Sequence, residues 1–288
     1  MHPSESRDLW HLIESTHAVT YFAPGCARAN QDLGFKGFWM GYFGARAAPM
    51  GAVGAAVVTA AFGGFAPGMV ERAIPDAWGF VEPGAAVEGR ASAAATALRE
   101  ALAEVDDVAD QLLGVLDKAL EVCEPAGRPL FAANKDVTPF EDPVADLWQM
   151  LTTLREHRGD GHLAVLTSEG VGGCEAHLLA LASRGELGGP AEELLRSARG
   201  WSDTDWTDSL TTLRSAGLLD TGGGLSERGR KLHAHLEART DELASPPFAG
   251  IGESGREHLR DCLIPIAASV VDTGWVPFPN PMGLPRVV

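Results

Sequence analysis

The sequence lacks features that several classes of protein require. Its four cysteines (Cys26, Cys123, Cys174 and Cys262) lie far apart and form no C-x-x-C pair, which disfavours a disulfide framework and favours reduced thiols in a cytoplasm. Basic residues are outnumbered, with 23 Lys and Arg against 39 Asp and Glu and a net charge of −16. This balance disfavours nucleic acid and anionic membranes as partners.

Long hydrophobic runs are missing as well. The opening residues M-H-P-S-E-S-R-D lack the cationic and apolar regions of a signal peptide. The nearly uncharged segment Ala47–Pro67 is rich in Ala and Gly and is interrupted by Pro49, so a packed core helix is expected there rather than a membrane span. We therefore predict a cytoplasmic protein with no membrane partner.

No common catalytic motif occurs in the chain. There is no Walker loop, Rossmann glycine fingerprint, H-E-x-x-H, G-x-S-x-G or zinc-spaced set of Cys and His. Any site must therefore consist of side chains outside these motifs, and the motifs predict neither a reaction nor a metal.

What the sequence does contain is helical periodicity. Its 288 residues suffice for two interlocked domains. Amphipathic helical patterns precede and follow a connection rich in proline and loop residues. We predict an N-terminal helical domain at 1–124, a linker at 125–143 and a C-terminal domain with an extended tail at 144–288.

The segment Trp201–Asp241 predicts a helix, a hairpin and a second helix. Ser202 suits an N-cap, with acidic residues in the first turn and apolar residues at helical spacing after it. Gly217 ends this helix, the glycines at 222–224 can turn the chain through positive φ angles, and Ser226 begins the next helix.

This order of elements, with the phrases AGLLD and LSERGRKL on either side of the glycine turn, resembles MarR-like winged-helix proteins. The unit is complete if 175–182 and 191–199 form the two preceding helices. The resemblance implies an all-α fold with a small β-wing at about Leu218–Leu225. It places a winged helix-turn-helix in the C-terminal half, packed on the N-terminal helical domain.

Other phrases are similar to a family of actinobacterial helix-turn-helix-type proteins. They include G-F-W-x-G-Y-F-x-x-R-A-A-P-x-G, R-A-I-P-x-A-W and L-R-E-H-R-G-D-G-H. This similarity spans nearly the whole chain. It implies the helix-turn-helix fold, and it supplies no reaction and no catalytic residue.

The charge of the helix-turn-helix segment bears on DNA binding. Between Trp201 and Asp241, five Lys and Arg stand against seven Asp and Glu, a net charge of −2. Proteins gain most of their affinity for DNA by neutralising phosphates with cations. We therefore expect specific DNA binding to be weak or absent.

Two pairs of polar residues lie in strongly apolar, aromatic helical segments. His17 and Tyr21 are four residues apart, so their side chains meet on one helix face, where they suit an acid/base pair or a haem ligand. Tyr42 and Arg46 share this spacing and suit the binding of an anionic group. The structural alternatives are a hydrogen-bonded core histidine and an internal salt bridge.

Arg158, Asp160 and His162 form a third group. Asp160 can fix an imidazole tautomer and Arg158 can bind an anion. The alternative is that R-G-D-G forms a turn in which Asp160 is the N-cap of a helix starting at His162.

Buried polar groups are costly unless they are paired, so we predict that the three groups face one cavity between the two halves of the chain. Aromatic residues near them can provide its flat walls. Haem in this cavity would take His17 or His162 as its axial ligand, and no other metal is expected. The predicted catalytic residues are His17, Tyr21 and His162. The predicted ligand-binding residues are Phe38, Trp39, Tyr42, Arg46, Arg158 and Asp160.

The sequence leaves two functions open. In the first, the winged helix is a scaffold and the cavity binds a small organic ligand or cofactor, with or without a reaction on it. In the second, the protein is a MarR-like, ligand-responsive transcriptional regulator that binds DNA as a homodimer. The acidic composition favours the first.

Overall fold

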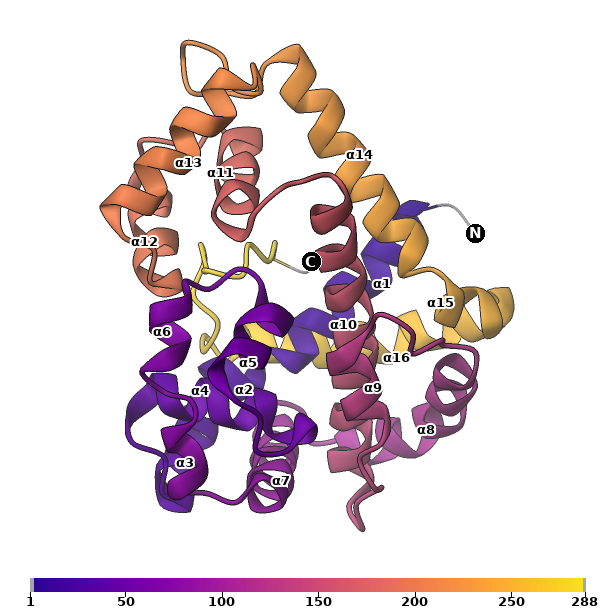
Figure 1. Ribbon diagram of the computed structural model, residues 1–288. Helices are drawn as coiled ribbons and strands as arrows, with labels where there is room; N and C mark the ends of the chain where they lie inside the picture. The colour runs from indigo at the N-terminus through magenta and orange to yellow at the C-terminus, as the bar shows by residue number, and fades with distance from the viewer. Residues whose placement is uncertain (1–2, 287–288) are drawn as a thin grey trace.

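The computed structural model describes residues 3–286, which fold as sixteen α-helices and two short 3₁₀ helices joined by loops (Figure 1). Helices before the predicted linker are α1 (Pro3–His17), α2 (Val19–Phe22), α3 (Pro24–Leu33), α4 (Gly37–Ala47), η1 (Ala48–Met50), α5 (Ala55–Phe62), α6 (Pro67–Glu71), η2 (Asp76–Gly79), α7 (Pro83–Ala101) and α8 (Val105–Glu121). Those after them are α9 (Pro129–Lys135), α10 (Pro143–Ser168), α11 (Gly173–Arg184), α12 (Pro190–Arg199), α13 (Asp203–Ser215), α14 (Glu227–Leu243), α15 (Pro246–Gly250) and α16 (Gly252–Asp272).

Helix α10 lies at the centre of the fold (Figure 1). It has 26 residues, which corresponds to a length of about 39 Å at 1.5 Å per residue. Asp142 caps its N-terminus by accepting a hydrogen bond from the Val144 amide, and Pro143 occupies the first helical position. Because α10 packs against α1, α7, α8, α9 and α14, it connects the two halves of the sequence.

The turn predicted at R-G-D-G is absent, because α10 continues through Gly159 and Gly161. Tertiary contacts explain the continuous helix. A Cβ atom on Gly161 would lie 2.7 Å from Nη1 of Arg128, which donates to the His157 carbonyl within α10. Asp160 is not an N-cap, since its carboxylate accepts a hydrogen bond of 2.9 Å from the Phe131 amide in α9. Gly161 therefore admits the Arg128 side chain, and neither glycine ends the helix.

Three hydrophobic cores hold the helices together. The first contains side chains of α1, α7, α8, α10 and α16, and it therefore draws on both of the predicted domains. The second lies under α4, α5 and α6, and the third fills the space between α11, α12, α13 and α14. The boundary at 125–143 remains a prediction, and α9 lies within that segment.

The helix-turn-helix unit consists of α11, α12 and α13. Three residues, Gly200 to Ser202, join α12 to α13, and Gly200 has a φ of +72°, as the turn of this motif requires. Ser202 and Asp205 form a reciprocal capping box at the start of α13. The helix predicted after Ser202 is confirmed.

The predicted β-wing is wrong. Residues 3–286 form no strand, and the pairing at Leu218–Leu225 is reduced to one isolated antiparallel bridge between Leu219 and Leu225. Asp220 explains this, because its carboxylate accepts from the amides of Gly222 and Gly224 and closes the loop locally. The loop is a tight turn between α13 and α14 with no further residues to extend a ladder.

Within the described residues, no single helix is both long and apolar enough to cross a membrane. A bent pair of segments, Gly37–Met50 and Ala55–Phe62, meets the length and composition requirements together, with an angle of 92° between them.

Candidate functional site

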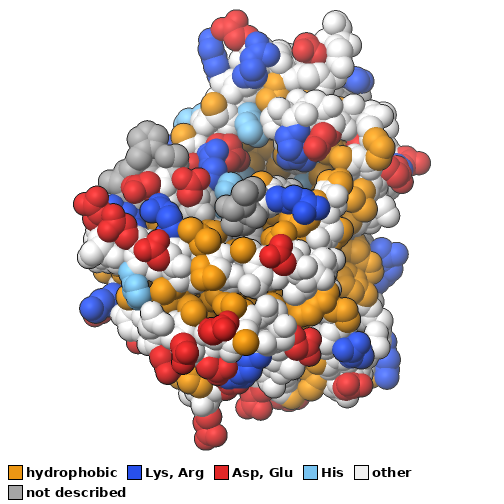
Figure 2. Space-filling model, turned by 180° about the vertical axis from the view of Figure 1, so that it is seen from behind, with side chains coloured by type: hydrophobic (Ala, Val, Ile, Leu, Met, Phe, Trp, Pro, Cys, Tyr) orange, Lys and Arg blue, Asp and Glu red, His pale blue; other side chains and the backbone are white. Residues whose placement is uncertain are grey.

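A cavity of about 520 Å³ lies where the aromatic N-terminal helices face α10 and the helix-turn-helix unit. Seven of the nine predicted site residues line it: Tyr21, Phe38, Trp39, Tyr42, Arg46, Arg158 and His162. Seen from behind, the molecule is hollowed, with apolar side chains inside the hollow and cationic and histidine side chains around it (Figure 2). The roles of these residues remain predictions, but the structure brings them together.

Aromatic rings form one wall of this cavity. Tyr42 lies at the centre of the group, with ring centroids 5.7 Å from Trp39, 5.4 Å from Phe65 and 5.1 Å from Tyr21. Trp39 keeps 37% of its surface exposed and Phe38 keeps 50%. Large apolar side chains with this exposure are typical of a binding surface.

Buried ion pairs form the floor of the cavity. Arg46 donates two hydrogen bonds of 3.0 Å to the carboxylate of Glu156, a residue of α10 that is only 1% exposed. Arg155 donates to Glu156 at 2.7 Å and holds Glu14 of α1 with its Nε at 2.9 Å. Two arginines and two glutamates thus neutralise one another, which corresponds to the structural alternative for Arg46.

The ionisation of this floor follows from its contacts. Burial favours the neutral form of Glu156, but the charges of Arg46 and Arg155 prevail and hold its pKa well below the usual range. Burial likewise opposes the charge on Arg46, and the Glu156 carboxylate outweighs it and raises the pKa of Arg46. Glu156 and Arg46 are therefore both charged at neutral pH.

His17 lies beneath the cavity rather than in its wall, and it is 3% exposed. The Thr152 hydroxyl already donates to the Trp148 carbonyl at 2.8 Å, so Nδ1 of His17 donates to Thr152 across 2.9 Å. Its Nε2 then accepts from the Tyr21 hydroxyl at 3.2 Å. Burial lowers the pKa of His17, aided by Arg155. Since both ring nitrogens have protein partners, His17 has none left for an axial haem bond.

His162 has a different environment. The Thr240 hydroxyl donates to the Leu236 carbonyl at 2.7 Å, so Nδ1 of His162 donates to Thr240 across 3.0 Å. Its Nε2 has no hydrogen-bond partner among residues 3–286, and the side chain lines the cavity. Burial lowers the pKa of His162, although Glu237 opposes the effect. A neutral imidazole thus presents an acceptor nitrogen to the cavity.

Arg158 and Asp160, two members of the third predicted group, lie in different places. Arg158 lies in the cavity wall, 2.8 Å from the Asp241 carboxylate and with its guanidinium 4.7 Å from the Trp10 ring centroid. Asp160 points away toward α9, where burial raises its pKa to about 6 against the opposing hydrogen bond from the Phe131 amide.

Two residues of the helix-turn-helix unit that sequence reasoning missed also line the cavity. His177 of α11 donates from Nε2 to the Gly64 carbonyl at 2.8 Å, and burial, helped by Arg199, lowers its pKa to about 3. Arg199, the last residue of α12, lies over the Phe65 ring at 4.5 Å. Neither residue lies in a strongly apolar, aromatic helical segment. The sequence pattern that predicted the other site residues therefore does not include them.

Metal ligation has little support from the described part of the chain. Residues 3–286 contain no group of three or more His, Cys, Asp or Glu arranged to hold a metal ion. Of the two histidines predicted as axial haem ligands, His17 and His162, only His162 has a ring nitrogen without a protein partner that faces the cavity among the described residues. Haem remains a prediction.

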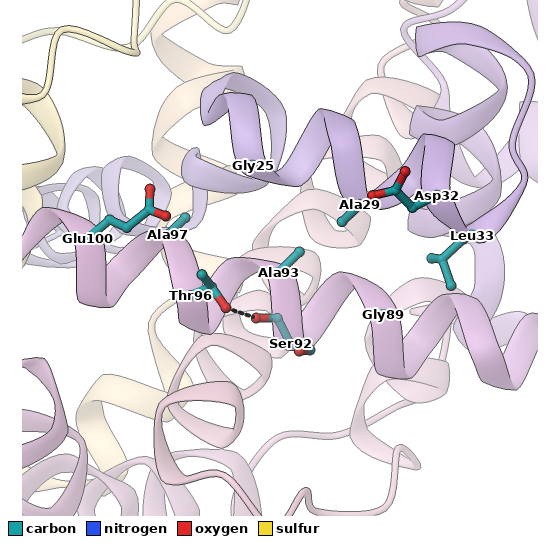
Figure 3. A pocket seen from close by; sticks show the side chains of 10 residues that line it. All are labelled: Gly25, Ala29, Asp32, Leu33, Gly89, Ser92, Ala93, Thr96, Ala97 and Glu100. Carbon is teal, nitrogen blue, oxygen red and sulfur yellow. Dashed lines mark hydrogen bonds between the residues drawn. The ribbon is translucent and has the colours of Figure 1, made fainter.

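A second hollow of about 440 Å³ lies between α3 and α7 (Figure 3). Its walls consist mostly of small side chains, with Asp32 toward one end and Glu100 toward the other. It has no cation and no aromatic ring in its lining, so it offers a ligand little to recognise. The site is therefore the cavity at the helix-turn-helix unit.

The arrangement of α11, α12 and α13 around a short glycine turn is that of a helix-turn-helix protein. The sequence pattern of a group described as a helix-turn-helix family matches residues 6–277, and the chain belongs to this family. No match was found among curated proteins or among solved structures.

Proposed function

We propose that this protein is a ligand-responsive helix-turn-helix regulator, in which a small molecule in the cavity alters DNA binding by α13. The observation that carries the proposal is that helices of the helix-turn-helix unit line the cavity themselves. His177 comes from α11 and Arg199 from α12. Family membership supports the DNA-binding part.

The path from ligand to DNA is short. Arg199 is the last residue of α12, and only three residues separate it from α13. A ligand that contacts Arg199 therefore acts on the turn that fixes the angle between the two helices. A bound ligand shifts this angle only as far as it prefers one arrangement over another.

The outer face of α13 has groups that suit contact with DNA. Thr204, Thr207 and Thr211 are exposed there, and hydroxyl groups can bond to bases or phosphates. Arg214 and Arg228 are exposed, and no carboxylate of residues 3–286 lies within ion-pair distance of either. Both are therefore free to meet phosphate.

The experiment is a selection of bound sequences from a pool of random DNA duplexes at low and physiological salt. We expect an enriched sequence, and we expect Arg214→Glu combined with Arg228→Glu to remove binding. Arg28→Glu combined with Lys118→Glu, on α3 and α8, makes the same change in net charge away from this unit and should retain binding. No enrichment at either salt concentration would overturn the regulator.

The second candidate function is ligand binding, with or without a reaction, on a helix-turn-helix unit that serves as scaffold. The acidity of α13 favours it, since Asp203, Asp205 and Asp208 repel phosphate. In this case the selection fails while the cavity still binds a small molecule. His162 is then the residue placed to accept a proton. The MarR-like part of the earlier resemblance depended on a wing and is not retained.

A further inference from the structure

The charges around the cavity show which ligand it suits. On the floor, Arg46 and Arg155 are matched by Glu14 and Glu156, as described above. These four charges cancel within hydrogen-bonded contacts, so they offer no net attraction to an incoming ion.

A second balanced set lies at the side formed by α1, α10 and α14. Arg158 lies 2.8 Å from Asp241, which also accepts a hydrogen bond of 2.6 Å from Arg7. Arg7 in turn lies 3.3 Å from Glu237. Two arginines again meet two carboxylates.

Arg199 is the cation that remains. Among residues 3–286, no carboxylate lies within ion-pair distance of it. Its Nη2 donates to the Pro281 carbonyl at 2.9 Å, and its buried Nε has no hydrogen-bond partner. Burial lowers the pKa of Arg199, the Tyr42 side chain opposes this, and Arg46 adds to it. A partly buried guanidinium without a counter-ion is unfavourable, and an anion placed beside it relieves that cost.

The surroundings of Arg199 are aromatic. Its guanidinium stacks on Phe65, whose centroid lies 5.4 Å from Tyr42 and 6.2 Å from Trp39. Planar rings favour stacked or edge-on contact with other planar rings. The cavity volume of about 520 Å³ falls within the range of roughly 300–1,000 Å³ that small-molecule sites occupy.

We infer that the cavity binds a planar aromatic carboxylate, whose single negative charge pairs with Arg199 and whose rings lie against the wall of Trp39, Tyr42 and Phe65. Because Arg199 alone among the cavity arginines lacks a carboxylate partner within the described residues, the site favours a ligand with one negative charge. This inference rests on the ligand-binding part of the proposed function and does not depend on DNA binding.

The test compares two probes of matched shape, 2-naphthoate and 2-naphthamide, by isothermal titration calorimetry on the full chain. We expect 2-naphthoate to bind at least ten-fold more tightly than the amide. Arg199→Gln should remove this preference. The control Arg196→Gln lies on the same helix and outside the cavity lining, where Arg196 is paired with Glu193, and it should leave the preference unchanged.

A cavity-filling variant locates the binding. Ala180→Trp, in the cavity lining, should weaken 2-naphthoate at least ten-fold, while circular dichroism confirms that it and Arg199→Gln remain folded. If both probes bind wild type equally and Ala180→Trp blocks both, the cavity is a ligand pocket that does not select a negative charge. That result overturns the selection for a carboxylate. Binding that Ala180→Trp does not affect, or no binding up to millimolar concentration, overturns the inference.

Discussion

Arg46 of α4 and Glu156 of α10 form a two-pronged ion pair, with both nitrogen–oxygen distances at 3.0 Å and the carboxylate buried. The pair joins the aromatic N-terminal helices to the centre of the fold. Residues 110 positions apart thus fix the floor of the cavity, and the ligand site and the stability of the fold share the same groups.

Replacing Glu156 by Gln should therefore lower the free energy of unfolding by about 3–5 kcal/mol, because Arg46 loses its counter-charge and Arg155 keeps only Glu14. Urea denaturation at pH 7 measures the change. Glu121→Gln, at an exposed position on α8, should change stability by less than about 0.5 kcal/mol. A loss below about 1 kcal/mol at Glu156 would contradict a buried ionic floor.

Gly200→Ala should destabilise the turn between α12 and α13. Gly200 has a φ of +72°, and an added Cβ would lie 2.7 Å from Sδ of Met69. The left-handed conformation alone costs an alanine about 1–2 kcal/mol. We expect a loss of at least about 1 kcal/mol in thermal or urea unfolding, together with weaker DNA binding in the selection assay.

The matched control for this variant is Gly114→Ala on α8, where an added Cβ meets nothing within 4 Å. In a helix interior, alanine is more stable than glycine by about 0.5–1 kcal/mol, so stability should rise. If the two alanine variants shift stability in the same direction, the strained geometry assigned to the turn is wrong.

His17 and His162 should differ in their response to replacement. His17→Leu removes two buried hydrogen bonds and should lower the free energy of unfolding by about 1–3 kcal/mol. Because His17 lies below the cavity, 2-naphthoate should still bind within about threefold of wild type. His162→Leu should keep the fold stable within about 1 kcal/mol. A loss of ligand binding in His17→Leu with unchanged stability would support the prediction that this residue belongs to the ligand site.

Stability should fall as the pH drops from 7 to 5. The pKa of buried His157 is lowered to about 3, by burial first and then by Arg128, and that of His177 is also about 3. In the unfolded chain both histidines bind a proton near pH 6.5, so the unfolded state gains protons that the folded state does not. Each contributes a loss of about 1–2 kcal/mol over this range.

Asp160 acts in the opposite sense. Its folded pKa of about 6 lies above the unfolded value, so its contribution is fully present at low pH and is lost as the pH rises through about 6. Asp160→Asn should therefore steepen the acid-induced loss of stability between pH 7 and 5 by about 1 kcal/mol. Urea denaturation at both pH values checks the slope, and a shallower slope in the variant would contradict the environment assigned to Asp160.

Sequence patterns predicted local elements well where local contacts decide them. The helix after Ser202 depends on a cap and on apolar spacing within one turn, and it forms as predicted. The predicted β-wing does not form because the Asp220 carboxylate accepts hydrogen bonds from amides of the loop. This contact competes with pairing of two strands, and hydrophobic periodicity does not reveal it. The helix does not break at R-G-D-G because Arg128 packs against Gly161 and the Phe131 amide of α9 binds the Asp160 carboxylate.

The sequence by itself determined that the chain is helical, that a helix-turn-helix unit occupies its C-terminal half, and which aromatic segments have polar residues at helical spacing. Only the tertiary structure decided which polar groups are matched. His17 is satisfied by Thr152 and Tyr21, whereas Arg199 lacks a carboxylate partner within the described residues. The physical reason is that ion pairing and burial depend on residues far apart in the chain, and no local pattern records the distance between them.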